Sequence, residues 1–432
     1  MPTEVGAGCW PSLGSPGDPA TNAAPPVALY IHIPFCVSHC PYCDFVVLAG
    51  AATRGPRNRM AAFVQALMTE LHLRADALDE NFGPPQSSGG STRSPLRSLY
   101  LGGGTPTLLP AESIERIVGI VRQRYGLAND AEVTIEANPG ADERGDLRAL
   151  REAGFNRLSI GAQSLDADEI RLLGRRHTPA DVVATVLEAR AAGIRSVSLD
   201  LLYDIPGASI ATWRDTLQAA VALEPDHLSL YALTLDDPDA EGLTGRGGDH
   251  LPVTTGARRW RQRARPRQDE DRAAAMYELA TERLAGAGYH SYEISNWARP
   301  GHASRHNLAY WQHLPYEAVG PGGHAFDGGT RRWTVARLDT YLAALAPSDG
   351  SPPRLPPGGT ELVDGRMASA ERTILALRLA DGLAAAEGGR EPLAGQLAWA
   401  LEAGLLAQTP GERLVLTTRG RLLSNELFSR LV

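Results

Sequence analysis

Lysine is absent from this chain of 432 residues, so every basic side chain other than histidine is an arginine. Acidic residues number 50 against 42 arginines, and the net charge of −8 argues against general binding to nucleic acid. No apolar run reaches the ~18 residues that a membrane-spanning helix needs. No basic start followed by an apolar segment marks an export signal. We therefore expect a cytoplasmic chain without a transmembrane segment.

Cysteine is also scarce, with four residues in the chain, which fits a reducing compartment and excludes a scaffold built on disulfides. Three of the four, Cys36, Cys40 and Cys43, lie within eight residues in the spacing C-x3-C-x2-C. Clustered thiolates are the ligands of iron–sulfur clusters. Three of them hold three irons of a 4Fe–4S cluster and leave the fourth iron open to a small molecule. The alternative is a zinc site completed by Cys9 or a nearby histidine, but the second paired half typical of such sites is absent.

Six β-like runs alternate with segments that are apolar on one face, which predicts a parallel sheet built from right-handed βαβ units. Strands are expected over 28–33, 98–102, 132–137, 157–162, 196–203 and 227–233, and helices over 60–78, 111–125, 143–153, 179–193 and 211–223. Six units are too few for a closed eight-fold barrel. The pattern fits a partial barrel or an open, doubly wound sheet.

Segments rich in glycine, proline and serine predict the domain organisation. Residues 1–27 are expected to form a flexible tail with Cys9 as a free thiol. The barrel domain is expected over 28–345 with insertions at 80–97 and 240–268, and a small, mainly helical domain over 361–432 follows a linker at 346–359. The arginines between 258 and 267 predict a solvated insertion rather than a nucleic-acid patch, because three acidic residues follow at 269–271.

Polar and glycine residues follow the predicted strands, at the edge where functional groups of barrels and open α/β sheets gather. Gly103, Gly104 and Thr105 follow the second strand within the run LGGGTPT. Glycines there let the backbone approach a ligand closely, because no Cβ intrudes. A simple strand-to-helix turn is the alternative, but it requires fewer glycines than the three present.

The chain resembles the oxygen-independent coproporphyrinogen III oxidase-like family of radical S-adenosylmethionine (SAM) proteins. The resemblance is carried, in the family's order, by YIHIPFCVSHCPYC, LGGGTPT, IEANP, LSIGAQS, LDLLYDIPG, YEISNWARPG and HNLAYW, within about residues 28–330. It implies an α/β fold, a partial (β/α)6 radical SAM barrel with a small, mainly helical C-terminal domain.

The resemblance also implies roles for individual residues. It assigns a 4Fe–4S cluster to the three clustered cysteines. It assigns SAM contacts to Tyr30, Gly103, Gly104, Thr105, Glu136, Gln163, Arg175 and Asp200. Taken alone, Glu136 reads equally as a helix cap, and Arg175 as a partner of Asp168 or Glu169. Asp204 departs from the family, which usually has glycine at that position.

Two branches of this family differ in function. Decarboxylases that convert coproporphyrinogen III to protoporphyrinogen IX carry a further cysteine two positions after the third ligand, where this chain has Phe45. Heme chaperones of the HemW branch carry the motif H-N-x-x-Y-W, implicated in heme binding, and His306, Asn307, Tyr310 and Trp311 complete it here. Without the family context, the same residues read more simply as a helix N-cap followed by core aromatics.

We therefore expect a heme chaperone that binds a 4Fe–4S cluster, SAM and heme. The alternatives are a coproporphyrinogen III dehydrogenase of heme biosynthesis and a radical SAM enzyme of another substrate class. The partners that the resemblance implies are heme and apo-hemoproteins such as respiratory heme proteins or bacterioferritin. It also allows a homodimer and a peripheral position at the inner membrane face.

Overall fold

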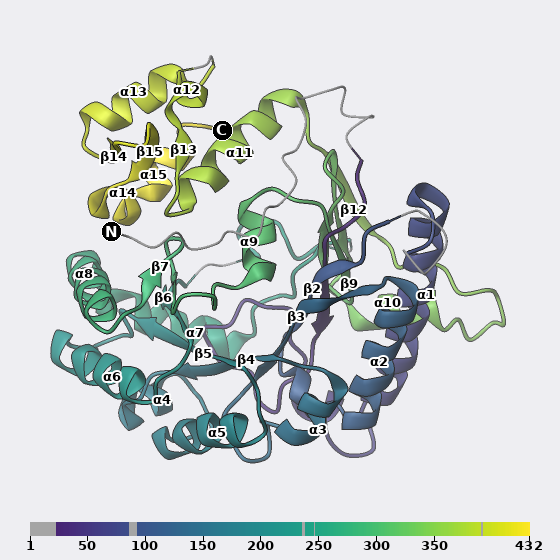
Figure 1. Cartoon of the computed structure of the whole chain (residues 1–432). Helices are drawn as coiled ribbons and strands as arrows, with labels where there is room; N and C mark the ends of the chain where they lie inside the picture. The colour runs from purple at the N-terminus through teal and green to yellow at the C-terminus, as the bar shows by residue number, and fades with distance from the viewer. Residues whose placement is uncertain (1–22, 86–92, 236–237, 246, 390–391) are drawn as a thin grey trace.

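The computed structural model of the chain describes residues 23–85, 93–235, 238–245, 247–389 and 392–432 (Figure 1). Its centre is a run of six neighbouring parallel strands, as the sequence predicts. These are β1 Ala28–Ile33, β2 Leu96–Gly103, β3 Leu127–Ala137, β4 Arg157–Gln163, β5 Ser196–Tyr203 and β6 His227–Ala232. The α/β fold with a parallel core is confirmed.

Short strands extend this sheet on both sides to 12 strands within the described residues. Beyond β1 lie β9 Tyr316–Val319, β10 His324–Phe326, β11 Thr330–Thr334 and β12 Gly358–Leu362, of which β9 runs parallel to β1. Beyond β6 lie β8 Asn296–Ala298 and β7 His290–Ser291, both antiparallel to their neighbours. The sequence prediction missed all six, because strands of two to five residues carry too little periodicity to be seen locally.

Helices cover the outer face of the curved sheet (Figure 1). They are α1 Met60–Phe82, α2 Ala111–Arg124, α3 Leu147–Ala153, α4 Ala167–Leu172, α5 Pro179–Ala191, α6 Ile210–Ala222, α8 Glu270–Gly286 and α10 Leu338–Leu345. Helix α2 shows why: Ile114, Ile117, Val118 and Val121 repeat at helical spacing and are all buried. The sheet and these apolar faces share one large core.

Two further helices lie close to the interior of the barrel, α7 Thr255–Ala264 and α9 Arg305–Trp311. Helix α7 falls in the segment expected to be a solvated insertion. That expectation is wrong for Arg261, whose side chain is only 6% exposed. Ala257 and Ala264 flank it on the same buried face, so α7 packs against the barrel by a narrow stripe of mostly small residues.

The C-terminal segment is mainly helical, with α11 Gly365–Arg378, α12 Ala385–Gly388, α13 Ala394–Glu402, α14 Thr418–Leu422 and α15 Ser424–Ser429. These helices surround a small antiparallel sheet of β13 Leu383–Ala384, β15 Arg413–Leu416 and β14 Leu406–Gln408. The C-terminal unit has a leucine-rich core of its own. It lies beside β6, β7 and α9 (Figure 1), and a buried ion pair between Glu293 and Arg378 joins it to the barrel.

Parts of the expected tail and of the first insertion, residues 1–22 with Cys9 and residues 86–92, lie outside the described residues. Within the described end of the tail, the Ala24 and Val27 amides donate to the carbonyls of Asp327 and Pro315 at 2.8 and 3.0 Å. In the described part of the chain, no helix combines the length and apolar character required to cross a bilayer.

Candidate functional site

The concave side of the sheet encloses a cavity of about 600 Å³, a size typical of ligand-binding pockets. It extends from the cysteine loop after β1 to the C-terminal unit. Ten residues assigned from the sequence line it: Cys36, Cys40, Cys43, Gly103, Gly104, Glu136, Gln163, Arg175, Asp200 and Asn307. The structure thus brings most of the predicted cluster and SAM residues together in one place.

The cysteine loop is fixed by short backbone contacts. The Cys36 amide donates to the Leu48 carbonyl at 2.9 Å, and the Cys43 amide to the Cys40 carbonyl at 3.1 Å. Thr105 does not line the cavity, but its Oγ1 lies 3.3 Å from Cys36 Sγ. Burial raises the pKa of Cys36 to about 11 and also raises the pKa of Cys43. Metal binding must therefore displace thiol protons.

The donor set fits an iron–sulfur cluster. Three cysteine thiols reach one cavity, and each iron of a 4Fe–4S cluster takes a single thiolate, so the three thiols can hold three of its irons. Within the described residues, no three His, Cys, Asp or Glu side chains converge as the ligands of a single ion would.

Arg261 of α7 supports this loop from behind. Its guanidinium donates to the carbonyls of Pro41 at 3.0 Å, Tyr42 at 3.2 Å and Cys43 at 3.0 Å. One buried cation thus binds three successive peptide groups of the segment that carries two of the cysteines. The sequence prediction missed this role, because the contacts join residues about 220 positions apart.

The glycine loop after β2 packs against the beginning of the cysteine loop. The Gly104 amide donates to the Ile33 carbonyl at 2.8 Å, and a Cβ on Gly104 would lie 2.6 Å from the Phe35 carbonyl oxygen. Gly103 has φ +110°, and a Cβ there would lie 2.5 Å from the His32 ring. The glycines are required for this close approach, which leaves their backbone on the cavity wall.

Glu136 lies near the end of β3 and is half-buried on the cavity wall. Its carboxylate accepts from the Tyr100 hydroxyl at 2.8 Å and from the Gly103 amide at 2.9 Å. Burial, with a smaller contribution from the Asp200 charge, raises the pKa of Glu136 to about 7. The helix-cap interpretation of this residue is wrong, since it belongs to a strand.

Arg175 points into the cavity near the cysteine loop. It donates to the Gly161 carbonyl at 2.8 Å and its Nη1 lies 3.7 Å from Cys40 Sγ. The alternative pairing with Asp168 or Glu169 does not occur, because both carboxylates have other partners. A guanidinium held in this way can bind a ligand carboxylate.

Two further polar residues line the middle of the cavity. Asp200 on β5 accepts from the Ser159 hydroxyl at 3.0 Å, and burial raises the pKa of Asp200. Gln163, the last residue of β4, has φ +65°, the left-handed region that is uncommon for residues other than glycine.

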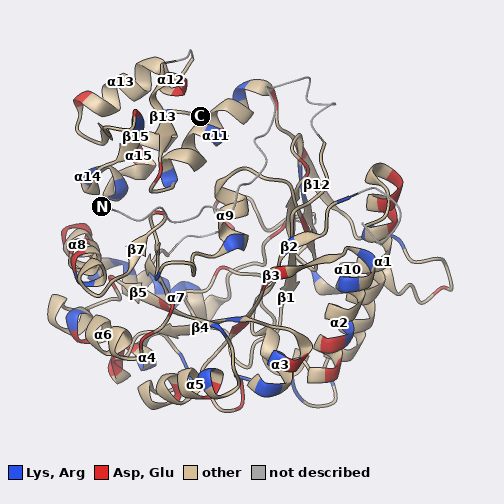
Figure 2. Ribbon diagram, in the orientation of Figure 1, with Lys and Arg blue, Asp and Glu red and all other residues tan. Residues whose placement is uncertain are grey.

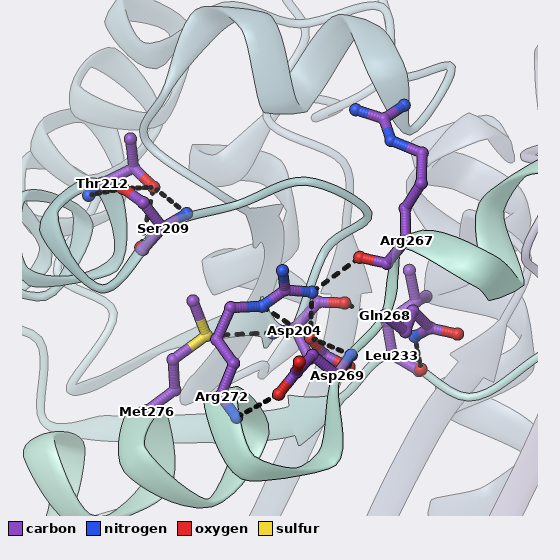
Figure 3. A network of polar contacts seen from close by, with 9 residues as sticks. All are labelled: Asp204, Ser209, Thr212, Leu233, Arg267, Gln268, Asp269, Arg272 and Met276. Atoms are coloured by element: carbon purple, nitrogen blue, oxygen red, sulfur yellow. Dashed lines mark hydrogen bonds and ion pairs between the residues drawn. The ribbon is translucent and has the colours of Figure 1, made fainter.

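Asp204 stands where the family usually has glycine, and the structure explains the exchange. Its φ of +53° lies in the left-handed region, which glycine prefers and aspartate tolerates. Its carboxylate accepts from Arg272 Nε at 3.0 Å (Figure 3) and does not line the cavity. The departure from the family pattern therefore lies outside the cavity lining.

The H-N-x-x-Y-W motif forms α9, whose N-cap is Ser304. The His306 ring is 1% exposed, with Nδ1 at 2.9 Å from the Ser98 hydroxyl and Nε2 at 2.7 Å from the Tyr310 hydroxyl. Burial lowers the pKa of His306 to about 3. The alternative interpretation, with His306 and Asn307 as the N-cap, is wrong because Ser304 caps the helix. His306 instead packs inward against β2.

The other motif residues lie at different depths. Asn307 lines the cavity. Trp311 is half-buried and stacks under the guanidinium of Arg378, which lies 4.2 Å from the ring centre. Tyr30, assigned to SAM, does not line the cavity. Its hydroxyl lies 3.1 Å from His32 Nδ1.

Comparison with known proteins agrees with this arrangement. The family model "Radical SAM superfamily" matches residues 89–220. A protein named heme chaperone HemW from Mycobacterium tuberculosis is 36% identical over 407 residues, which cover 94% of this chain and 95% of that one. The chain belongs to the HemW family.

Other matches extend this result. Heme chaperone HemW from Bacillus subtilis is 32% identical over 92% of this chain and 97% of its own length. The solved structure of coproporphyrinogen III oxidase (HemN) from Escherichia coli shares the fold with a TM-score of 0.74, at 21% identity, over 96% of this chain and 92% of that one. Membership of the radical SAM superfamily implies a 4Fe–4S cluster and SAM as the cofactors of a HemW protein.

Several cavity residues of this HemW family member were not predicted. Arg157, His227 and Tyr231 come from the inner faces of β4 and β6, and Arg378 and Arg421 from the C-terminal unit. The strand residues had a signal, because they alternate with apolar residues along otherwise buried strands. The C-terminal arginines had no local sequence signal, since only docking of the C-terminal unit brings them to the cavity.

Proposed function

We propose that this protein is a heme chaperone, which binds a 4Fe–4S cluster, SAM and heme and delivers heme to apo-hemoproteins. The observation that carries the proposal is 36% identity across 94% of the chain to a protein of that name. The complete H-N-x-x-Y-W motif and the presence of Phe45 in place of a fourth loop cysteine support the same conclusion. Phe45 is 64% exposed and lines the cavity beside the cysteines.

In this proposal Cys36, Cys40 and Cys43 hold the cluster, which supplies an electron to SAM when it is reduced. Arg175 would bind the carboxylate of SAM, and the Gly103–Gly104 backbone its amino acid portion. Glu136 and Asp200 would accept from the ribose hydroxyls, because both are half-buried acceptors on the cavity wall.

The cluster is tested by anaerobic reconstitution. We expect about four irons and four sulfides per chain, and a loss of both in a Cys40→Ala variant. Stoichiometric zinc without inorganic sulfide would overturn the cluster assignment and, with it, the binding of SAM.

Heme is proposed to bind at the motif of α9. Ligation by His306 requires its ring to leave Ser98 and Tyr310, because both ring nitrogens are engaged in the structure. Titration with hemin, followed by the absorbance of the Soret band, should saturate at one equivalent for the wild type. His306→Ala should bind at least about tenfold more weakly, as expected for loss of an axial ligand. The exposed His290 provides the matched control, and equal binding by all three proteins would exclude His306 as the ligand.

Two further measurements test function. Incubation of the heme-loaded protein with an apo-hemoprotein should transfer heme, and respiratory heme proteins and bacterioferritin are the proposed recipients. Anaerobic incubation of the reconstituted protein with SAM, a reductant and coproporphyrinogen III should give no steady formation of protoporphyrinogen IX. Sustained formation of that product would contradict the heme-chaperone proposal and favour the dehydrogenase.

A further inference from the structure

The end of the cavity beside the C-terminal unit carries three arginines from three separate elements. Arg157 comes from β4, Arg378 from α11 and Arg421 from α14. Figure 2 marks arginines on α11 and α14 in blue. Arg157 is remote from the cysteine loop in the barrel, because it begins its strand and the cysteines follow the carboxyl end of theirs.

Arg157 is a buried cation that forms no ion pair within the described residues. It is 3% exposed, and Nη1 donates to the Ser196 hydroxyl and to the His302 carbonyl, both at 2.9 Å. The charge of Arg157 acts on the Asp200 carboxylate of the same cavity, but the two groups do not form a salt bridge. Burying an uncompensated charge is costly, so an anionic ligand at this end of the cavity would stabilise the site.

Arg421 comes from the C-terminal unit and is half-buried. Its Nη1 donates to the Ser291 hydroxyl at 2.8 Å, and it also forms no ion pair in the described part of the chain. Arg378 differs, since its Nε pairs with the buried Glu293 at 2.8 Å. Its guanidinium nevertheless lies on the cavity wall and stacks on Trp311.

The cluster end of the cavity carries both signs of charge, since Asp44, Glu136 and Glu143 line the wall there together with Arg175 and Arg176. The arginine end is shared with Ser304 and Asn307, which belong to the N-terminus of the motif helix. An anionic group is thus drawn to the same end of the cavity as the heme motif.

We propose that Arg157, Arg378 and Arg421 form a carboxylate-binding subsite that holds the propionate groups of a tetrapyrrole. This inference rests on the proposed function. Guanidinium groups bind carboxylates through paired hydrogen bonds, and two heme propionates can engage arginines from the barrel and from the C-terminal unit. The C-terminal unit contributes two of the three arginines, so it contacts the acid groups of the ligand directly.

The test compares protoporphyrin IX with its dimethyl ester, which has the same ring and no free carboxylate. Binding of each is followed by quenching of tryptophan fluorescence in the full-length protein, in one detergent-containing buffer. The wild type should bind the free acid at least about tenfold more tightly than the ester, as expected for two charge-assisted contacts. Hemin and its dimethyl ester are measured in parallel.

Arg421→Gln is the principal variant, because this residue is only half-buried and its loss breaks no ion pair. It should lower affinity for the free acid about fivefold to tenfold and leave affinity for the ester unchanged, and Arg421→Lys should recover part of the preference. Arg419→Gln is the matched control on the same helix, since Arg419 is exposed and does not line the cavity. Arg157→Gln provides a second variant from the barrel, used only where its far-UV circular dichroism matches the wild type.

The outcomes separate this inference from the proposed function. If hemin and porphyrin do not bind the wild type at all, the heme-chaperone proposal fails first. If the acid binds but the ester binds equally well, or if Arg421→Gln retains the full preference, the subsite is wrong and the heme proposal stands. A third outcome also overturns the inference. If Arg421→Gln weakens binding of the free acid and the ester alike, and added SAM removes that difference from the wild type, the arginines bind the SAM carboxylate.

Discussion

Replacement of Arg261 by methionine is predicted to loosen the cysteine loop without touching a cysteine. Methionine retains the long apolar stem within α7 and removes every hydrogen-bond donor. Three contacts of 3.0–3.2 Å to the carbonyls of Pro41, Tyr42 and Cys43 are lost. Because these carbonyls lie in a partly buried loop, they regain only part of their hydrogen bonding from water.

The magnitude follows from the number and type of the contacts. A hydrogen bond to a charged group contributes about 1.5–3 kcal/mol, and removing the buried guanidinium returns its desolvation cost. We expect a net loss of about 3 kcal/mol for the three contacts together. Urea unfolding of the apo-protein measures this loss as a lower midpoint with an unchanged slope.

A second readout is specific to the loop. After anaerobic reconstitution, the iron–sulfur absorbance of Arg261→Met should decay severalfold faster in air than that of the wild type, because solvent reaches a loosened loop more often. Arg263→Met, on the exposed side of the same helix, is the control. The reasoning is refuted if Arg261→Met retains both the wild-type midpoint and the wild-type decay rate, or if the control loses as much.

Three further predictions concern acidic groups. Asp204→Ala should lower the free energy of unfolding by about 2–3 kcal/mol, because it leaves Arg272 without its partner and places alanine at φ +53°. Glu136→Gln should stabilise the apo-protein above pH 7 and not below pH 5. Folding raises the pKa of Glu136 from 4.5 to about 7, so the wild type loses about 3 kcal/mol as pH rises through this interval. Glu293→Ala should cost about 3 kcal/mol and speed proteolysis at 346–359, because it removes the buried partner of Arg378.

A control variant or a contradicting outcome tests each of these predictions. Asp168→Ala removes an exposed ion pair with Arg171 and should change stability by less than about 1 kcal/mol. A comparable loss in that variant would contradict the role of burial at Asp204. For Glu136, the decisive result is the pH profile of thermal denaturation, and a constant difference between pH 5 and 8 would reject the raised pKa. For Glu293, unchanged cleavage of the C-terminal unit would show that other contacts dock it.

The parallel core was predictable because each βα unit has its own local pattern of apolar residues. The boundaries of β1 and β5 agree with the predicted 28–33 and 196–203, since both strands are buried, β-branched or leucine-rich runs between turn residues. The short outer strands were not predictable, because their conformation depends on the neighbour to which they pair. Strand β8, three residues long, exists through its pairing with β6.

The site divides in the same way. The cysteines and the glycine loop were visible because their chemistry depends on spacing within one segment. Arg261 was misread because a run of arginines followed by acidic residues normally indicates a solvated surface. Nothing local distinguishes the one arginine that turns inward. Arg421 was invisible for a related reason, since its place in the cavity depends on how an entire unit docks.

In the proposed function, the residues of the motif helix would combine a structural role with ligand binding. His306 is uncharged at neutral pH, because burial lowers its pKa to about 3, and a neutral imidazole is the form that binds iron. Both nitrogens are nevertheless engaged, and releasing two hydrogen bonds costs about 2 kcal/mol. That cost lowers the apparent heme affinity by about 30-fold relative to a freed ring. If His306 is the heme ligand, as proposed, the same contacts would keep its ring from the iron until they break, at the expense of affinity. A protein that must release heme to a recipient gains from such a closed state, because re-formation of these bonds favours departure of the ligand.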